Sequence, residues 1–134
     1  MKKTNLDLAH GWLRKAASDL RAAELCLQMG ESLDVACFHC QQTAEKALKA
    51  WLAHRQGEFP HIHDLERLVT PCSALDADFG KLTTAAEALN PYAAVMRYEE
   101  SFWPDADYLQ PLLSHARNVF DLVSQKLPPL PAQS

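Results

Sequence analysis

The stretch D-V-A-C-F-H-C-Q-Q-T-A-E-K-A-L-K-A-W-L (residues 34–52) decides the fold, because it contains no Gly or Pro and is rich in Ala, Leu, Lys and Glu. This composition predicts a helix of about five turns with Asp34 or Ser32 as its N-cap. The side that faces the core is an apolar seam at helical spacing, made of Cys37, Cys40, Ala44, Ala47, Leu48 and Trp51. The opposite seam is polar and consists of His39, Gln42, Lys46 and Lys49.

Two polar residues of this helix, Gln41 and Glu45, fall inside the arc that should face the core. A buried carboxylate is costly unless it is paired with a cation and hydrogen-bonded. The helix therefore requires a cationic partner from elsewhere in the chain, and Arg97 is the first candidate for pairing with Glu45.

Length and charge limit the class of protein. A chain of 134 residues predicts one domain that can bury a core without disulfides or metals. The net charge of −4 argues against a large nucleic-acid footprint but leaves room for a local basic patch. No apolar run approaches membrane-spanning length, and the N-terminal M-K-K-T-N-L-D-L lacks the apolar core of a secretion signal, so we expect a cytoplasmic protein with no membrane partner.

The remaining helices follow from heptad spacing and from breaker residues. Leucines recur every seven residues from Leu6 to Leu27 with alanines between them, which predicts a helix over 5–29 that pairs antiparallel with the next one. On its outer side, Lys15 and Asp19 form an i,i+4 pair. Further helices are expected at about 64–69 (ended by Pro71), 76–89 and 105–126, with an aromatic-rich irregular stretch at 90–105 that packs on the bundle and shapes a site.

No alternating pattern typical of strands is present. The predicted fold class is all-α, a four-to-five-helix up-and-down bundle over residues 1–127, followed by a disordered Pro-rich tail at 128–134.

The four cysteines (Cys26, Cys37, Cys40 and Cys72) are expected to be reduced and buried. The C-x-x-C at 37–40 lies in mid-helix on the apolar seam, and no second pair stands at the spacing of a zinc site. The sequence also lacks a Gly-rich phosphate loop, H-E-x-x-H and G-x-S-x-G. We therefore predict neither a metal nor a cofactor.

Three blocks, F-H-C-Q-Q-T-A-E-K-A-L-K-A-W-L (38–52), H-I-H-D-L (61–65) and L-N-P-Y-A-A-V-M-R-Y (89–98), resemble the HEPN domain family of small helical bacterial and archaeal proteins. Their order and spacing carry the resemblance, which extends from the first helix to the last. Two positions depart from the family pattern: Cys40 replaces a small residue, and Glu99 stands where Pro often follows Arg-Tyr.

The resemblance implies functions that the residue pattern does not show. Many HEPN proteins are encoded beside a minimal nucleotidyltransferase and work with it as a toxin–antitoxin pair, and some bind nucleotides. A large subset are metal-independent ribonucleases with an Arg-x(4–6)-His motif at a dimer cleft. Only Arg55 and His61 match that spacing here, and Gly57 and Pro60 lie between them, so a solvated loop is the competing interpretation.

A composite site is the stronger candidate for binding a nucleotide or RNA. Its members come from three blocks of the chain: Lys46, Lys49, His63, Asp64, Arg97 and Tyr98. The cations suit phosphate, and Tyr98 suits a base. In the competing interpretation Glu45 pairs with Arg97, Asp64 caps its own helix, and the two lysines form an ordinary solvated face.

Three functions follow in order of preference. The first is a nucleotide- or RNA-binding module, a homodimer that partners a minimal nucleotidyltransferase in a toxin–antitoxin-like pair. The second is a metal-independent endoribonuclease, and the third is a structural interaction protein without a ligand. The homodimer rests on the resemblance and on the surplus aromatics Trp12, Phe102 and Trp103.

Overall fold

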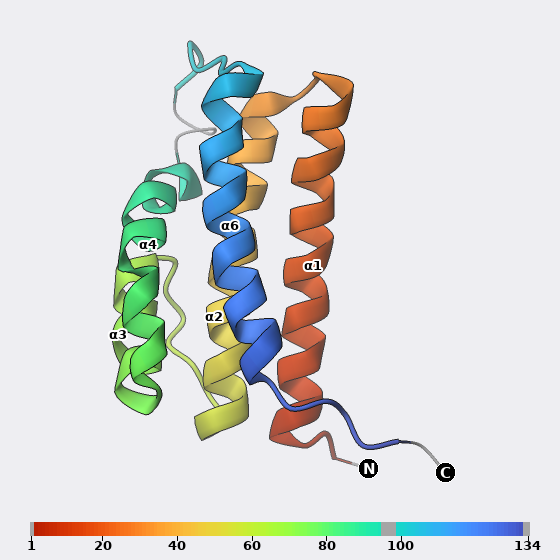
Figure 1. The fold of residues 1–134 in the computed structure, drawn as a ribbon, viewed down its shortest axis with the longest axis vertical. Coiled ribbons are helices and arrows are strands. Elements are labelled where there is room, and N and C mark those ends of the chain that lie inside the picture. Colours follow the sequence, from red (N-terminus) through yellow and green to blue (C-terminus); the bar gives the residue numbers. More distant parts are fainter. Residues whose placement is uncertain (1, 95–98, 133–134) are drawn as a thin grey trace.

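The computed structural model describes residues 2–94 and 99–132. Helices α1 (Asn5–Met29) and α2 (Leu33–Gln56) form a long antiparallel pair, and α6 (Ala106–Lys126) lies against both (Figure 1). The shorter α3 (Leu65–Leu75) and α4 (Thr83–Leu89) cover the other side of α2. Within these ranges the chain has five α-helices and no strand, which confirms the predicted all-α bundle.

Helix α1 begins and ends at the predicted residues because both of its ends are capped. Thr4 and Asp7 form a capping box, and Gly30 stops the helix with a left-handed φ of 66°. Its interleaved alanines, Ala9, Ala16 and Ala23, have no solvent-exposed surface. Small side chains at these positions allow the backbone of α1 to approach α2 closely.

Helix α2 is the centre of the bundle, and the predicted apolar seam is buried along its length. The helix begins two residues earlier than Asp34 as N-cap requires, so Asp34 is not its N-cap. Ser32 takes that position with a left-handed φ of 55° and no side-chain capping bond. Asp34 lies instead in the first turn, where its carboxylate is favourable at the positive end of the helix dipole.

Pro71 does not end α3, contrary to the prediction from sequence. A proline removes one helical hydrogen bond, and here the packing of the next turn outweighs that loss. Cys72 has no exposed surface, and its thiol contacts the Leu48 carbonyl of α2 at 3.7 Å. The buried side of α3 therefore continues past the proline to Leu75.

The helix expected over 76–89 is divided into two parts. A 3₁₀ helix, η1 (Ala77–Leu82), precedes α4, and Asp76 caps it by accepting a bond from the Asp78 backbone N–H at 3.0 Å. Three residues per turn place positions i and i+3 on one side. Phe79 and Leu82 therefore both point into the core, and Phe79 stacks on Trp51 with ring centroids 5.1 Å apart.

Two described aromatics of the stretch before α6, Tyr92 and Phe102, pack on the bundle, as expected. A second 3₁₀ helix, η2 (Asn90–Ala93), presents Tyr92, which packs with Phe102 and Tyr108. Asp105 caps α6 by accepting a bond from the Tyr108 backbone N–H, and Pro111 lies inside that helix.

After α6, the carbonyl of Pro128 accepts a hydrogen bond from His10 at 2.7 Å. The disorder expected for 128–134 stays a prediction. In the ranges that the structure covers, no helix is both long enough and apolar enough to span a bilayer.

The close approach of α1 and α2 predicts that Ala16→Leu destabilises the protein. The extra side chain has no room at a wholly buried position, so the free energy of unfolding should fall by about 1–3 kcal/mol. Urea unfolding measures the change. Ser18→Leu, at an exposed position of the same helix, is the control. Equal stability of Ala16→Leu and the wild type would contradict the packing described.

Candidate functional site

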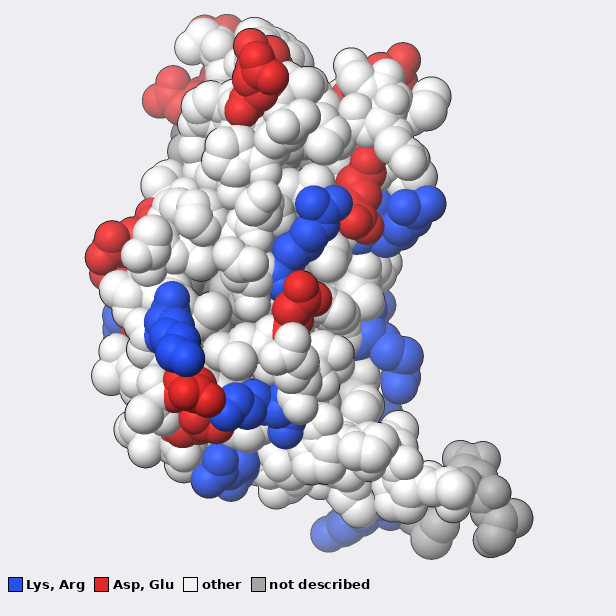
Figure 2. All heavy atoms as spheres, in the orientation of Figure 1, with Lys and Arg blue, Asp and Glu red and all other residues white. Residues whose placement is uncertain are grey.

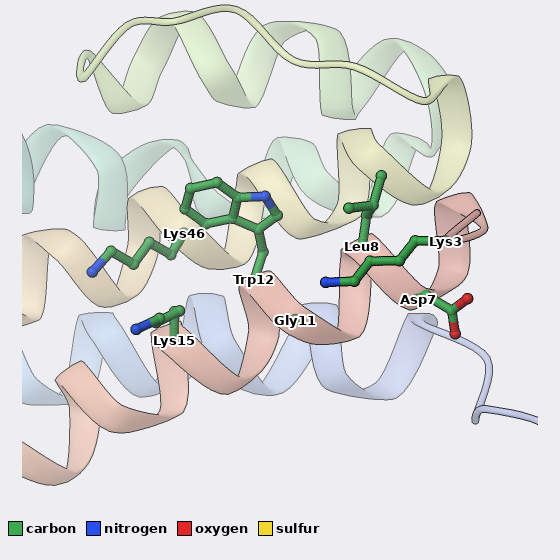
Figure 3. Close-up of a pocket in the computed structure, with 7 residues that line it drawn as sticks. All are labelled: Lys3, Asp7, Leu8, Gly11, Trp12, Lys15 and Lys46. Atoms are coloured by element: carbon green, nitrogen blue, oxygen red, sulfur yellow. The ribbon is translucent and has the colours of Figure 1, made fainter. Parts of the chain in front are cut away.

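A pocket of about 420 Å³ opens between the first half of α1 and the middle of α2 (Figure 3). Its volume lies in the range of about 300–1,000 Å³ that is typical of small-molecule sites. Seven residues line it: Lys3, Asp7, Leu8, Gly11, Trp12, Lys15 and Lys46. The indole of Trp12 and the Leu8 side chain supply apolar surface, and the lysines supply charge.

The ammonium groups of Lys3, Lys15 and Lys46 point in the same direction in the close-up view (Figure 3). Lys3 and Lys15 have no ion-pair partner among the residues that the structure describes. The pocket's one carboxylate, Asp7, is held in the α1 capping box by the Thr4 backbone N–H at 2.9 Å. That backbone bond holds the pKa of Asp7 below its ordinary value.

Charge is distributed unevenly over the molecule. On the side shown in Figure 2, the upper end carries acidic but not basic side chains, and the Lys and Arg side chains lie below it. The upper end holds the α1–α2 turn and the segment before α6, whereas the N-terminal residues lie at the lower end (Figure 1). The pocket lies at the half of α1 nearest the N-terminus, away from the acidic upper end. A local basic site is therefore compatible with the net charge of −4.

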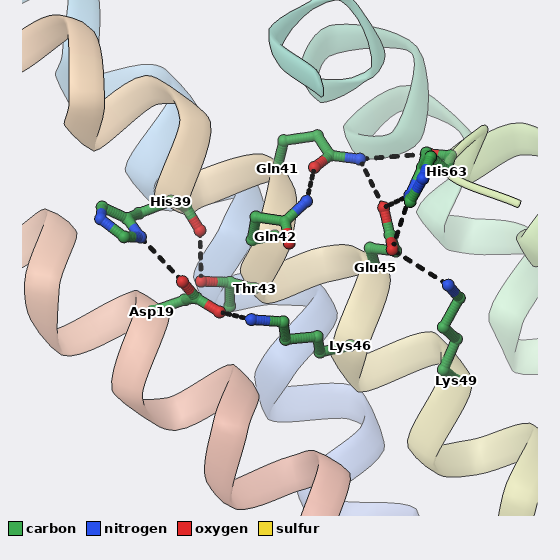
Figure 4. A network of polar contacts seen from close by, with 9 residues as sticks. All are labelled: Asp19, His39, Gln41, Gln42, Thr43, Glu45, Lys46, Lys49 and His63. Atoms are coloured by element: carbon green, nitrogen blue, oxygen red, sulfur yellow. Dashed lines mark hydrogen bonds and ion pairs between the residues drawn. The ribbon is translucent and has the colours of Figure 1, made fainter. Parts of the chain in front are cut away.

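Lys46 connects the pocket to a buried carboxylate on α1. Its ammonium donates to Asp19 Oδ2 at 2.6 Å, and His39 Nδ1 contacts Asp19 Oδ1 at 2.7 Å (Figure 4). Asp19 is 8% exposed. Burial alone would raise its pKa, but the bonds from His39 and Lys46 outweigh that effect and hold the pKa below its ordinary value. The ionised form of Asp19 is therefore stabilised by two residues of α2, His39 and Lys46.

A second buried carboxylate, Glu45, lies on the other side of α2. Lys49 donates to it at 3.0 Å, Gln41 at 3.2 Å and His63 Nδ1 at 3.1 Å (Figure 4). Burial would raise the pKa of Glu45, but the bonds from Lys49, Gln41 and His63 hold it below its ordinary value. Gln41 also donates to the His63 carbonyl at 3.1 Å, so the network fastens the α2–α3 connection to α2.

The same connection reaches the pocket through aromatic contacts. The Lys49 ammonium lies over the Phe59 ring, 5.3 Å from the ring centroid. The Phe59 and Trp12 rings pack edge-to-face with their centroids 5.3 Å apart. Phe59, which follows α2 in the chain, thus packs against the Trp12 indole. The pocket wall and the Glu45 network form one continuous contact chain.

The structure divides the composite site expected from sequence. Lys49 and His63 meet on Glu45, whereas Lys46 turns to Asp19 and the pocket. Asp64 caps α3, as the competing interpretation has it: its Oδ1 accepts from the Glu66 backbone at 3.0 Å and from the Asn90 side chain at 3.0 Å. Arg97 and Tyr98 lie outside the described residues, and with them the expected Glu45–Arg97 pair.

Two expectations about charged residues are wrong. Lys49 is placed by sequence on the polar seam, as a ligand-binding residue or as part of a solvated face, but it is 6% exposed because it leans back one helical turn onto Glu45. Asp19 is expected outside with Lys15, but it faces α2. The sequence holds a signal for Asp19: it lies three residues after Ala16 and four before Ala23, which places it on the side of α1 that packs on α2.

Arg55 and His61 pack on different aromatic rings. The Arg55 guanidinium lies 5.2 Å from the Trp51 ring centroid, and the exposed His61 ring lies 5.8 Å from the Phe59 centroid. Their catalytic role stays a prediction.

The cysteines are free thiols, as expected, but only Cys37, Cys40 and Cys72 are buried, and Cys26 is partly exposed. Burial raises the pKa of the Cys37, Cys40 and Cys72 thiols to about 12. They are therefore neutral packing groups. Among the described residues, no group of three His, Cys, Asp or Glu side chains is placed to hold a metal ion.

Comparison with known proteins agrees with this architecture. The sequence profile of the HEPN domain family matches residues 9–126, so the chain belongs to the HEPN domain family. Its structure is similar to the crystal structure of TT1696 from Thermus thermophilus, with a TM-score of 0.77 and 29% identity over 89% of this chain and 98% of that one.

A second solved structure shares the fold. It is that of ST0689, an archaeal HEPN homologue, with a TM-score of 0.70 and 23% identity over 96% of this chain and 100% of that one. A search among functionally curated proteins found no match. The resemblance carried by the three sequence blocks is therefore confirmed at the level of family and fold.

The Glu45 network predicts that Lys49→Met destabilises the protein, because it leaves a buried carboxylate without its cation. The free energy of unfolding should fall by about 3–5 kcal/mol in urea unfolding at pH 7. Adding Glu45→Gln should restore most of the loss, since a neutral amide needs no cation. Lys81→Met, at a side chain that is 80% exposed, is the matched control. No rescue by Glu45→Gln would contradict the pairing.

Proposed function

We propose that this HEPN protein is a nucleotide- or RNA-binding module that holds phosphate groups in the pocket between α1 and α2. The observation that carries the proposal is the presence of three lysines, Lys3, Lys15 and Lys46, in the lining of one pocket together with the Trp12 indole. Of the composite site expected from sequence, this proposal keeps Lys46 and does not need Arg97 or Tyr98.

The chemistry of the pocket suits a ligand that is both anionic and aromatic. Lysine ammonium groups bind phosphate as point charges, and an indole offers a stacking surface for a base of any identity. Phe59 fixes the Trp12 ring edge-on, so little side-chain entropy is lost when a base stacks on it. Binding of this type weakens as salt concentration rises.

The partner in this proposal is a minimal nucleotidyltransferase in a toxin–antitoxin-like pair, and the module itself is a homodimer. Membership of the HEPN family supports the partner. The homodimer is supported by aromatic surface away from the pocket, where Trp103 is 77% and Tyr108 is 45% exposed. A cytoplasmic location is part of the same proposal.

Charge reversal in the pocket tests the binding function. In fluorescence anisotropy with a labelled oligouridylate and with ATP as competitor, the double variant Lys3→Glu/Lys15→Glu should bind at least about tenfold more weakly than the wild type. Lys81→Glu carries a charge reversal of the same kind on η1, away from the pocket, and should change affinity less than about twofold. Absence of binding by the wild type, or equal loss in both variants, would contradict the proposal.

A further inference from the structure

Lys46 lies between two anionic sites, the Asp19 carboxylate and the position of a phosphate in the pocket. Its side chain lines the pocket, yet its ammonium is held by Asp19 at 2.6 Å. A phosphate in the pocket attracts the same ammonium. When Lys46 turns to the ligand, the buried Asp19 carboxylate keeps one partner, His39.

His39 can compensate for the loss by taking up a proton. The ionised Asp19 carboxylate only accepts hydrogen bonds, so His39 Nδ1 carries a hydrogen and, in the neutral ring, Nε2 is the free basic atom. The other ring nitrogen points away from Asp19 in Figure 4, and the His39 side chain is 27% exposed, so a proton from water can reach it. A protonated His39 would then balance the Asp19 charge.

We propose that His39 and Asp19 are positioning residues of the phosphate pocket, and that binding of a phosphodiester ligand to Lys46 draws one proton onto His39. This proposal rests on the proposed function, phosphate binding in the α1–α2 pocket, and adds that pH regulates this binding. Binding and protonation are reciprocal in such a coupling, so acidification strengthens binding. Histidine is suited to this role because its ordinary titration falls near neutral pH.

Other charged groups lie around α2, among them Lys15 of α1 in the pocket wall, which has no ion-pair partner in the part of the chain that the structure describes. Helix α1 presents Asp19 to His39, and α2 itself presents Lys46. From α6, Arg117 lies near Cys40 and is paired with Glu24 of α1 at 2.9 Å. From the α2–α3 connection, His63 is bound to Glu45. Asp34 lies in the first turn of α2. Among the described residues, Asp19 is the carboxylate in contact with His39.

The test is the affinity for oligouridylate between pH 5.5 and pH 8 at constant salt, with a reporter dye that does not titrate in this range. The phosphodiesters of this probe keep their charge, so a pH effect reports on the protein. The wild-type affinity should rise by up to about tenfold per pH unit as the pH falls through the histidine range. Calorimetry in two buffers of different ionisation enthalpy should show uptake of about one proton.

Three variants separate this coupling from a structural role. His39→Gln should bind without the pH dependence, whereas His63→Gln, which alters the Glu45 network, should keep it. Asp19→Asn releases Lys46 and should bind at pH 8 at least as tightly as the wild type does at pH 6; a merely structural role would weaken it.

The outcomes also separate this inference from the proposed function. Wild-type binding that is independent of pH, or a pH dependence that survives in His39→Gln, would overturn the coupling and leave phosphate binding intact. No binding at any pH would overturn both.

Discussion

The interaction on which the candidate site depends is the sharing of one buried carboxylate, Asp19, between His39 and Lys46. The small residues of α1 bring it close to α2, and Asp19 lies in that close interface with 8% of its surface exposed. An unpaired carboxylate in such a place would cost several kcal/mol, roughly the scale of the whole stability of a small domain. His39 and Lys46 lie seven residues apart on α2, about two turns, and so reach the carboxylate from both sides.

Glu45, on the other side of α2, is a second buried carboxylate that needs a cation and hydrogen-bond donors. Its cation comes from the next turn of the same helix, and its remaining bonds come from Gln41 and the α2–α3 connection. Both carboxyls have lowered pKa values, so each stabilises the fold above the ordinary carboxyl pKa, and that stability is lost as the pH falls through the lower folded-state value. Fixing these charges also fixes Lys46, Phe59 and Trp12, the residues that shape the pocket.

The fold could be predicted because its signals are local. Heptad alanines, Gly30 and the apolar seam of α2 each act within a few residues, and the structure agrees with them. The prediction for Pro71 is wrong because the burial of Cys72 against α2, a tertiary contact, outweighs a local preference. The predictions for Lys49 and Asp19 are wrong because each side chain is buried with an oppositely charged partner, Glu45 for Lys49 and Lys46 for Asp19. Helical spacing alone does not identify such partners. The pocket could not be predicted since it joins Lys3, Trp12 and Lys46, which are far apart in sequence.

The chain's three tryptophans can report on ligand binding at the α1–α2 pocket. Trp12 lines the pocket, Trp51 is buried against Phe79, and Trp103 is exposed in the segment at the opposite end of the bundle (Figure 1). The measurement is a ¹⁵N–¹H NMR titration of the three indole N–H signals with oligouridylate, assigned through Trp12→Phe. The Trp12 signal should shift while those of Trp51 and Trp103 stay in place. A shift of Trp103 with an unchanged Trp12 would contradict binding at this pocket.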